Sequence, residues 1–175
     1  MNQTLQDIHT RRSVRRFKAA PVEKELLDQV LQAGLEAASG RNHQDSRILV
    51  INNPELKKDI IACNAQIGGW AEDFDPFYGA PQILAVIGDT EIPTWQYNGT
   101  LVLGNMMLAA HSLGLGSCWI HRAKEEFELP QFKKLLQKAG LPETAAGVGF
   151  LALGYPDGEL PAPIMRKENR IITFD

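Results

Sequence analysis

Residues 99–116 read GTLVLGNMMLAAHSLGLG, and their apolar side chains would fall on nearly every side of a helix. A helix that is apolar all round is stable only when other protein surfaces bury it from all directions. A chain of 175 residues has little core with which to do so. We therefore expect this helix to pack partly on its own chain and partly on a second subunit, which predicts a homodimer.

Four segments around this helix have the composition of strands. Residues 81–89, PQILAVIGD, form an apolar run that predicts a strand buried on both faces. The other three candidates are RILVIN at 47–52, SCWIH at 117–121 and AGVGFLALGYP at 146–156.

Helical spacing of apolar residues marks the remaining regular segments. They are residues 1–10, a helix after Pro21 that should end near Ser39–Gly40, a helix opened by Pro54, and residues 129–140, closed by Gly140. The last twenty residues carry three prolines and should be extended. Strands and helices do not alternate regularly, so we expect one α+β domain over residues 1–175 rather than a Rossmann half.

Composition excludes several classes of function. The formal net charge of −3 argues against general nucleic-acid binding, although a nucleic-acid-binding domain that uses a local basic stretch remains an alternative. Cys63 and Cys118 lie far apart, and the four histidines lack ligand spacing, so we expect no metal site and no disulfide. No apolar stretch suits a membrane span or a signal peptide, which predicts a cytoplasmic protein without a membrane partner.

The stretch HTRRSVRRFKAAPV at residues 9–22 holds five cations between positions 11 and 18. A solvated charged face is one interpretation. Phosphate binding is the other, because guanidinium groups and a serine hydroxyl supply donors of fixed geometry. A second basic cluster contains Arg166, Lys167 and Arg170, so the two clusters could converge on one phosphomonoester.

Two loops have both a structural and a functional interpretation. ASGRNHQ, at 38–44, is either a plain connection or a set of donors and acceptors for a heterocycle. QIGGWAEDFDPFYGAP, at 66–81, is aromatic-rich and either completes the core or forms a lid. The glycines at 114 and 116 follow a helix and precede a strand, which is the reverse of a dinucleotide fingerprint.

Four motifs in order, RRSVRRF, ASGRNHQ, GLGSCWIH and GYPDGELPAPIMRKE, resemble those of the flavin-dependent nitroreductase family across nearly the whole chain. The resemblance implies a central sheet of about four to five strands flanked by helices, in an intertwined homodimer with two shared FMN sites. The chain departs from the family at Asp45–Ser46, where relatives often carry Pro-Trp.

The resemblance also implies which residues bind the cofactor. Arg11, Ser13 and Arg15 would hold the phosphate and ribityl chain, with the Arg12 backbone beside them and Arg166 reaching the same phosphate. The partner's copy of the second motif would add its own donors. The remaining expected contacts are Ser39, Gly40, Asn42 and Gln44, and, along one flavin face, Cys118, Trp119, Ile120 and His121.

The family's chemistry is a hydride transfer from NADH or NADPH to FMN, followed by reduction of a nitroaromatic, quinone or related acceptor in ping-pong order. A backbone N–H near Ile120 and His121 would point at the flavin N5. His121 is the one side chain that we consider as a general acid, and solvent is an equal alternative. A flavin-binding carrier or redox sensor without fast turnover is the competing hypothesis.

Overall fold

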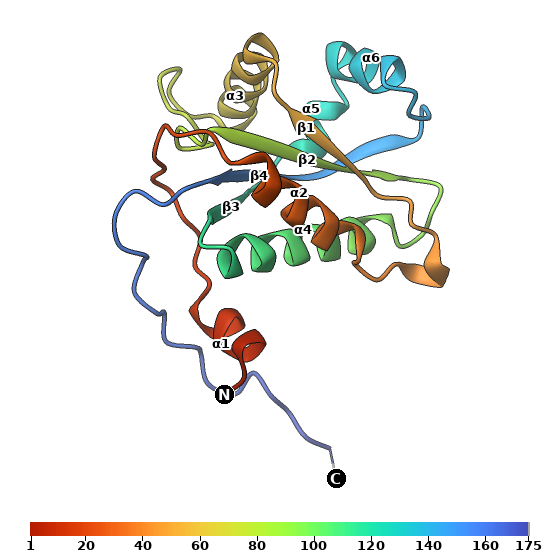
Figure 1. Cartoon of the computed structure of the whole chain (residues 1–175). Coiled ribbons are helices and arrows are strands. Elements are labelled where there is room, and N and C mark those ends of the chain that lie inside the picture. The colour runs from red at the N-terminus through yellow and green to blue at the C-terminus, as the bar shows by residue number, and fades with distance from the viewer. Residues whose placement is uncertain (175) are drawn as a thin grey trace.

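The computed structural model describes residues 1–174 and places helices on both faces of a four-stranded sheet (Figure 1). The strands lie in the order β1-β2-β4-β3, and every neighbouring pair is antiparallel. Their bounds are β1 Arg47–Ile51, β2 Gln82–Asp89, β3 Gly116–Ile120 and β4 Ala145–Gly154. All four predicted strands are therefore confirmed, as is the α+β class.

The two central strands explain their apolar sequences. β2 pairs with β4 over its whole length, and seven of its eight residues are buried. Successive side chains of a strand point to opposite faces of the sheet. Because helices cover both faces, the side chains on either face must be apolar. The expectation that this strand is buried on both faces is confirmed, although the sheet is antiparallel.

Helices α2 (Lys24–Leu35) and α4 (Trp95–Ser112) cover one face of the sheet. Helices α3 (Pro54–Gly68), α5 (Ala123–Phe127) and α6 (Pro130–Lys138) cover the other (Figure 1). Each face has its own buried cluster, so the sheet separates two cores. The short α5 and a 3-10 turn at Gly40–Asn42 were not predicted from the sequence.

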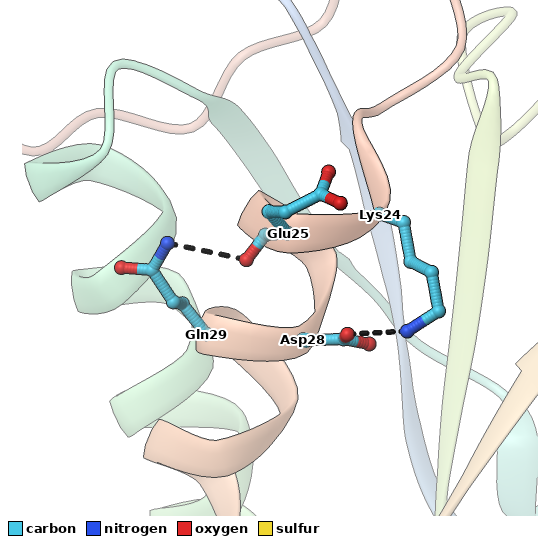
Figure 2. Close-up of polar contacts among 4 residues, drawn as sticks. All are labelled: Lys24, Glu25, Asp28 and Gln29. Carbon is cyan, nitrogen blue, oxygen red and sulfur yellow. Dashed lines mark hydrogen bonds and ion pairs between the residues drawn. The ribbon is translucent and has the colours of Figure 1, made fainter.

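Helix α2 ends at Leu35, so the prediction of an end near Ser39–Gly40 is wrong by about one turn. The Ala37 N–H donates to Gly34 instead of continuing the helical pattern, and Ser39 is extended. At its start, α2 has no side-chain cap. Its first turn is closed instead by the Lys24–Asp28 ion pair and by Gln29 Nε2 donating to the Glu25 carbonyl at 3.1 Å (Figure 2).

Helix α4 begins at Trp95, four residues earlier than its apolar stretch. One side is buried in the core through Val102, Leu103 and Met106. On the opposite side, Tyr97 is 72% exposed and Leu101 is 50% exposed. The chain alone thus covers only part of this helix, as the homodimer prediction requires.

The two terminal segments extend away from the three-layered body together (Figure 1). Helix α1 (Gln3–Thr10) lies beyond the end of α4, and the chain after β4 runs past it without helix or strand (Figure 1). The extended C-terminal segment is therefore confirmed. It exposes six large apolar side chains, those of Leu160, Ile164, Met165, Ile171, Ile172 and Phe174. No helix within residues 1–174 combines the length and apolar character needed to cross a membrane.

Candidate functional site

The basic N-terminal stretch lies along the beginning of β3. Ser13 forms a parallel bridge with Ser117, and the Val14 N–H donates to the Ser117 carbonyl at 2.9 Å. Val14 is buried against Gly116, where a Cβ would come within 2.8 Å of its side chain. This contact needs a residue without a side chain at Gly116, and it holds the stretch from Arg11 to Arg15 against the sheet.

The same stretch continues beside the chain's C-terminal segment. Phe17 bridges to Pro156, and the Lys18 N–H donates to the Tyr155 carbonyl at 2.9 Å. Arg16 is directed to Asp157: its Nε donates to the Asp157 carbonyl at 2.7 Å and lies 3.4 Å from the carboxylate. Arg16 therefore pairs with Asp157 and does not join the cluster formed by Arg11, Arg12 and Arg15.

The two predicted basic clusters meet in a cavity of about 220 Å³. It is lined by Arg11, Arg12, Ser13, Arg15, Pro161, Ala162, Ile164 and Arg166. Within residues 1–174, Arg11 Nη1 and Arg12 Nε are buried and have no hydrogen-bond partner. Buried donors are almost always paired, so these two fit an anionic group with several acceptor oxygens, such as a phosphate.

Arg12 has a second task, because its Nη1 donates to the carbonyls of His9 and Arg11, both at 2.8 Å. These bonds hold the backbone where α1 ends. Arg12 therefore shapes the cavity as well as lining it, whereas sequence reasoning assigned a role only to its backbone.

The side chains of β3 divide between the two sides of the sheet. Cys118 and Ile120 are buried in the core with α5, whereas Trp119 is half-buried toward α4. Burial raises the pKa of the Cys118 thiol, and the charges of Arg15 and Arg11 only partly oppose it. A ligand at β3 would thus meet the backbone of Cys118 and Ile120, and the thiol is a structural group rather than a nucleophile.

His121 is exposed directly after β3. Arg122 follows with a φ of 76°, in the left-handed region, and α5 then begins. The Ala123 carbonyl approaches β4 so closely that a Cβ at Gly147 would come within 2.2 Å of it. Gly147 therefore determines how the turn at His121–Arg122 rests on the sheet.

The loop with Ser39, Gly40, Asn42 and Gln44 is held at the beginning of α4. Asn98 accepts the Gly40 N–H at 2.9 Å and donates to Asp45 Oδ1 at 2.7 Å. Asn42 and Gln44 adopt positive φ values of 56° and 49°. Non-glycine residues persist in this conformation only where the surroundings impose it, which is common at functional sites.

Within one chain, this loop does not reach the cationic cavity. The loop is tied to Asn98, whereas Thr10, just before the cavity, shares a 2.8 Å hydrogen bond with His111 near the other end of α4. An α-helix rises 1.5 Å per residue, so these two points are about 20 Å apart. Within one chain, the two groups of predicted contacts therefore do not share one cavity.

The aromatic loop after α3 completes the core with one ring and exposes others at the surface. Phe77 is fully buried in the core, whereas Trp70 and Phe74 are about 40% exposed. Edge-on contacts link Trp70 to Phe74 at 5.0 Å and Phe74 to Tyr78 at 6.2 Å. We call Trp70, Phe74 and Tyr78 the aromatic row.

Each end of the aromatic row carries a cation. Arg15 lies over Tyr78 at 5.9 Å, and Arg122 lies over Trp70 at 4.5 Å. The row therefore extends from the cationic cavity to the turn after β3. Sequence reasoning missed Arg122 because it is one cation in an ordinary polar stretch.

Sequence reasoning also missed a buried polar pair, Asn64 and Glu126, behind the end of β3. The sequence did contain a pattern that indicates burial of Glu126. Ala123, Glu126 and Phe127 have the spacing of one helical face, and the apolar residues on either side indicate that this face is buried.

Comparisons with known proteins agree with this geometry. The sequence profile of the nitroreductase family matches residues 8–155. An NADPH-flavin oxidoreductase of Vibrio harveyi is 30% identical over 185 residues, which cover 97% of this chain and 75% of that protein. A crystal structure of a nitroreductase with bound FMN from Bacteroides fragilis superimposes with a TM-score of 0.88 at 28% identity, and covers 100% of both chains. An FMN-bound nitroreductase from Desulfitobacterium hafniense, also matched over 100% of both chains, gives 0.87 at 26% identity.

Proposed function

Because the chain belongs to the nitroreductase family, we propose that it is an FMN-dependent oxidoreductase that takes a hydride from NADH or NADPH and reduces nitroaromatic, quinone or related acceptors in ping-pong order. The observation that carries the proposal is the cavity lined by Arg11 and Arg12, each of which also buries a side-chain nitrogen without a hydrogen-bond partner. Bound FMN would supply the hydride-accepting ring, and the protein would bind and orient it.

The cavity fits the phosphate end of FMN. Arg11, Ser13, Arg15 and Arg166 line one cavity, and charge-assisted bonds to phosphate are among the strongest that side chains make. The same cations would favour negative charge that develops on the reduced ring. No other group of side chains in residues 1–174 combines buried, unpaired guanidinium donors with a cavity.

A homodimer would complete each site. We infer that Ser39, Gly40, Asn42 and Gln44 of one subunit face the cationic cavity of the other, because the anchors of the loop and of the cavity on α4 are about 20 Å apart in one chain. The exposed side of α4 and the apolar C-terminal segment both need cover. A C-terminal segment wrapped over the partner would make the dimer intertwined.

The ring would lie along β3, with the backbone N–H near Ile120 and His121 directed at N5. The buried side chains of Cys118 and Ile120 leave the backbone free for this contact. His121 is exposed and can exchange a proton with an acceptor or with solvent. A His121→Ala change should therefore slow acceptor reduction modestly and leave FMN bound.

The aromatic row supports a planar acceptor. Trp70 and Phe74 expose ring surface on which a flat molecule can stack, and Arg122 beside them has no ion-pair partner among residues 1–174. Nitroaromatics and quinones have the required shape.

Stopped-flow mixing of the purified flavoprotein tests the proposal. NADH or NADPH should bleach the bound flavin, and a quinone or nitroaromatic should restore its colour. The competing hypothesis, a flavin carrier or redox sensor, predicts a yellow protein that neither reagent changes quickly. A colourless protein that does not bind added FMN would contradict both.

We propose further that residues 1–175 act as one nitroreductase-like FMN-binding domain in the cytoplasm. The family profile spans residues 8–155, and the C-terminal Arg166 lines the cavity of the N-terminal cluster. Beginning and end of the sequence would thus serve the same site.

A further inference from the structure

Asn64 of α3 and Glu126 of α5 form a polar pair in the otherwise apolar core behind the end of β3. Both residues are 0% exposed. Asn64 Nδ2 donates to Glu126 Oε2 at 3.1 Å and to the His121 carbonyl at 2.9 Å. Both hydrogens of one amide are therefore used to tie α5 to the backbone that leaves β3.

The tied backbone is the turn at His121–Arg122. Arg122 is in the left-handed conformation, which costs energy for a residue with a side chain. The turn rests on β4 through Ala123 and Gly147 on one side. On the other side, Asn64 donates a hydrogen bond to the His121 carbonyl, so the pair defines the direction of this peptide.

The surroundings of Glu126 favour the uncharged acid. None of the ion pairs within residues 1–174 involves it, and both its Oε1 and Asn64 Oδ1 are buried without a partner. An ionised carboxylate that is buried without a cation is strongly disfavoured. A protonated carboxyl turns one of these two unpaired acceptors into a donor, for which the other can be the acceptor.

The ionisable groups on the elements around Glu126 do not change this conclusion. Cys63 of α3 is the one coupled to it, and β4 carries no ionisable side chain. The lysines of α6, the charged residues Lys124 and Glu125 of α5, and Glu128 directly after α5 are exposed. Burial raises the pKa of Glu126 to about 8, against a smaller lowering by the Asn64 hydrogen bond.

We propose that Asn64 and Glu126 are positioning residues of the flavin site, which hold the His121–Arg122 turn in place through an uncharged Glu126. The inference rests on the proposed function for the statement that this turn faces the flavin N5. The pair acts through the His121 backbone and touches neither cofactor nor acceptor. Ionisation of Glu126 would place a negative charge behind the turn. In the proposed site, this turn faces the flavin N5, which accepts the hydride.

Four variants test the proposal in the full-length protein with bound FMN. Asn64→Ala and Glu126→Leu should slow the reduction of the flavin by NADPH, by up to about 100-fold, because small displacements of reacting groups have effects of that size. Glu126→Gln keeps a neutral group of the same shape and should recover most of the rate. Glu125→Gln, an exposed change one residue away, is the matched control.

The pH profile separates positioning from general support of the fold. In the wild type, the reduction rate should fall as the pH rises through about 8, where Glu126 loses its proton. Glu126→Gln should lack this fall, and Glu125→Gln should retain it. FMN affinity should change little in all four variants, since the cationic cavity lies elsewhere.

Two further measurements do not depend on turnover. Infrared spectra at pH 7 should show a protonated carboxyl band in the wild type and in Glu125→Gln, and this band should be lost in Glu126→Gln. Hydrogen exchange at the amides of His121 and Arg122 should be faster in Asn64→Ala. If NADPH fails to bleach the wild-type flavin, the proposed function is wrong, and these two measurements still decide the present proposal.

A wild-type reduction rate with unchanged amide exchange in Asn64→Ala would overturn it. So would the same infrared spectrum in the wild type and Glu126→Gln at pH 7. If Glu126→Leu fails to fold, Asn64→Ala and Glu126→Gln still test the proposal. Asn64→Ala introduces a smaller side chain, and Glu126→Gln introduces one of the same shape as the original.

Discussion

At the scale of single residues, neighbouring arginines have different surroundings. Arg11 and Arg12 each bury a nitrogen without a partner at the cavity, whereas Arg16 is already bonded to Asp157. The positive charge is similar in all three. What differs is whether the donor is free to bind a ligand, and that depends on the partner that the fold brings to it.

Arg11→Ala should weaken FMN binding by about 1.5–3 kcal/mol, the usual contribution of a hydrogen bond to a charged group. Fluorescence quenching on titration of FMN into the apo protein measures the affinity. Arg16→Ala is the control, because it removes the same charge from outside the cavity, and it should bind FMN nearly as the wild type does. Equal affinity of Arg11→Ala and wild type would remove Arg11 from the site.

Glu126 should make stability depend on pH in a direction opposite to that of most carboxylates. Its pKa is raised from 4.5 to about 8 in the folded protein. Between these values the folded state holds a proton that the unfolded state has lost, so stability is greatest below pH 4.5 and decreases as the pH rises toward 8. The slope from this residue is at most about 1.4 kcal/mol per pH unit.

Urea unfolding between pH 6 and pH 8, at constant protein concentration, measures this effect. The wild type should lose stability over that range relative to Glu126→Gln, in which the slope from this residue disappears. Parallel pH profiles of the two proteins would show that Glu126 is ionised throughout.

At the scale of elements, α4 decides both architecture and site. Its buried side forms the core on one face of the sheet, and its two ends hold the two halves of the predicted flavin site. Its exposed side, with Tyr97 and Leu101, remains uncovered in one chain. The length of this helix separates the halves, and its uncovered side offers the surface through which a second chain can bring them together.

Leu101→Glu should therefore dissociate the dimer and lower FMN occupancy with it. Burial of a leucine side chain contributes about 1.5–3 kcal/mol, and a carboxylate in its place has no partner there. Light scattering after gel filtration gives the mass, and absorbance gives the bound flavin. Lys133→Glu on the exposed side of α6 is the control, which should stay dimeric. A dimeric, fully flavinated Leu101→Glu protein would place the interface elsewhere.

At the scale of the whole molecule, the question is whether the sites are shared. The cavity with Arg11 and the loop with Asn42 lie near opposite ends of α4 in one chain. In the proposed twofold dimer, the cavity of one chain would face the loop of the other, twice. Stability, flavin binding and dimer formation should then be coupled.

Complementation between two defective chains tests this coupling. Arg11→Ala and Asn42→Ala homodimers should each bind FMN weakly at both sites. A heterodimer of the two should contain one intact site, because both changes fall in the other site. Co-expression with two affinity tags isolates the heterodimer, and its flavin content should be one per dimer. A heterodimer as poor in flavin as its parents would mean that each site is built within one chain.

Much of the local structure followed from the sequence. Period and composition predicted all four strands, the apolar character of β2 and the extended C-terminal segment. The end of α2 and the beginning of α4 were wrong by about one turn, because helix ends depend on competing hydrogen bonds rather than on apolar spacing. The five-residue α5 was missed because it is too short for a periodic pattern.

The sequence by itself determined the four strands, the longer helices, the basic stretch and the order of the four motifs. Only the tertiary structure decided that Arg166 lines the cavity with Arg11, and that the Ser39–Gln44 loop does not. It alone brought Asn64 to Glu126, 62 residues away, and to the carbonyl of His121. The physical reason is that local propensities act within a few residues, whereas contacts between distant segments are determined by which faces pack together and which buried polar groups then find partners.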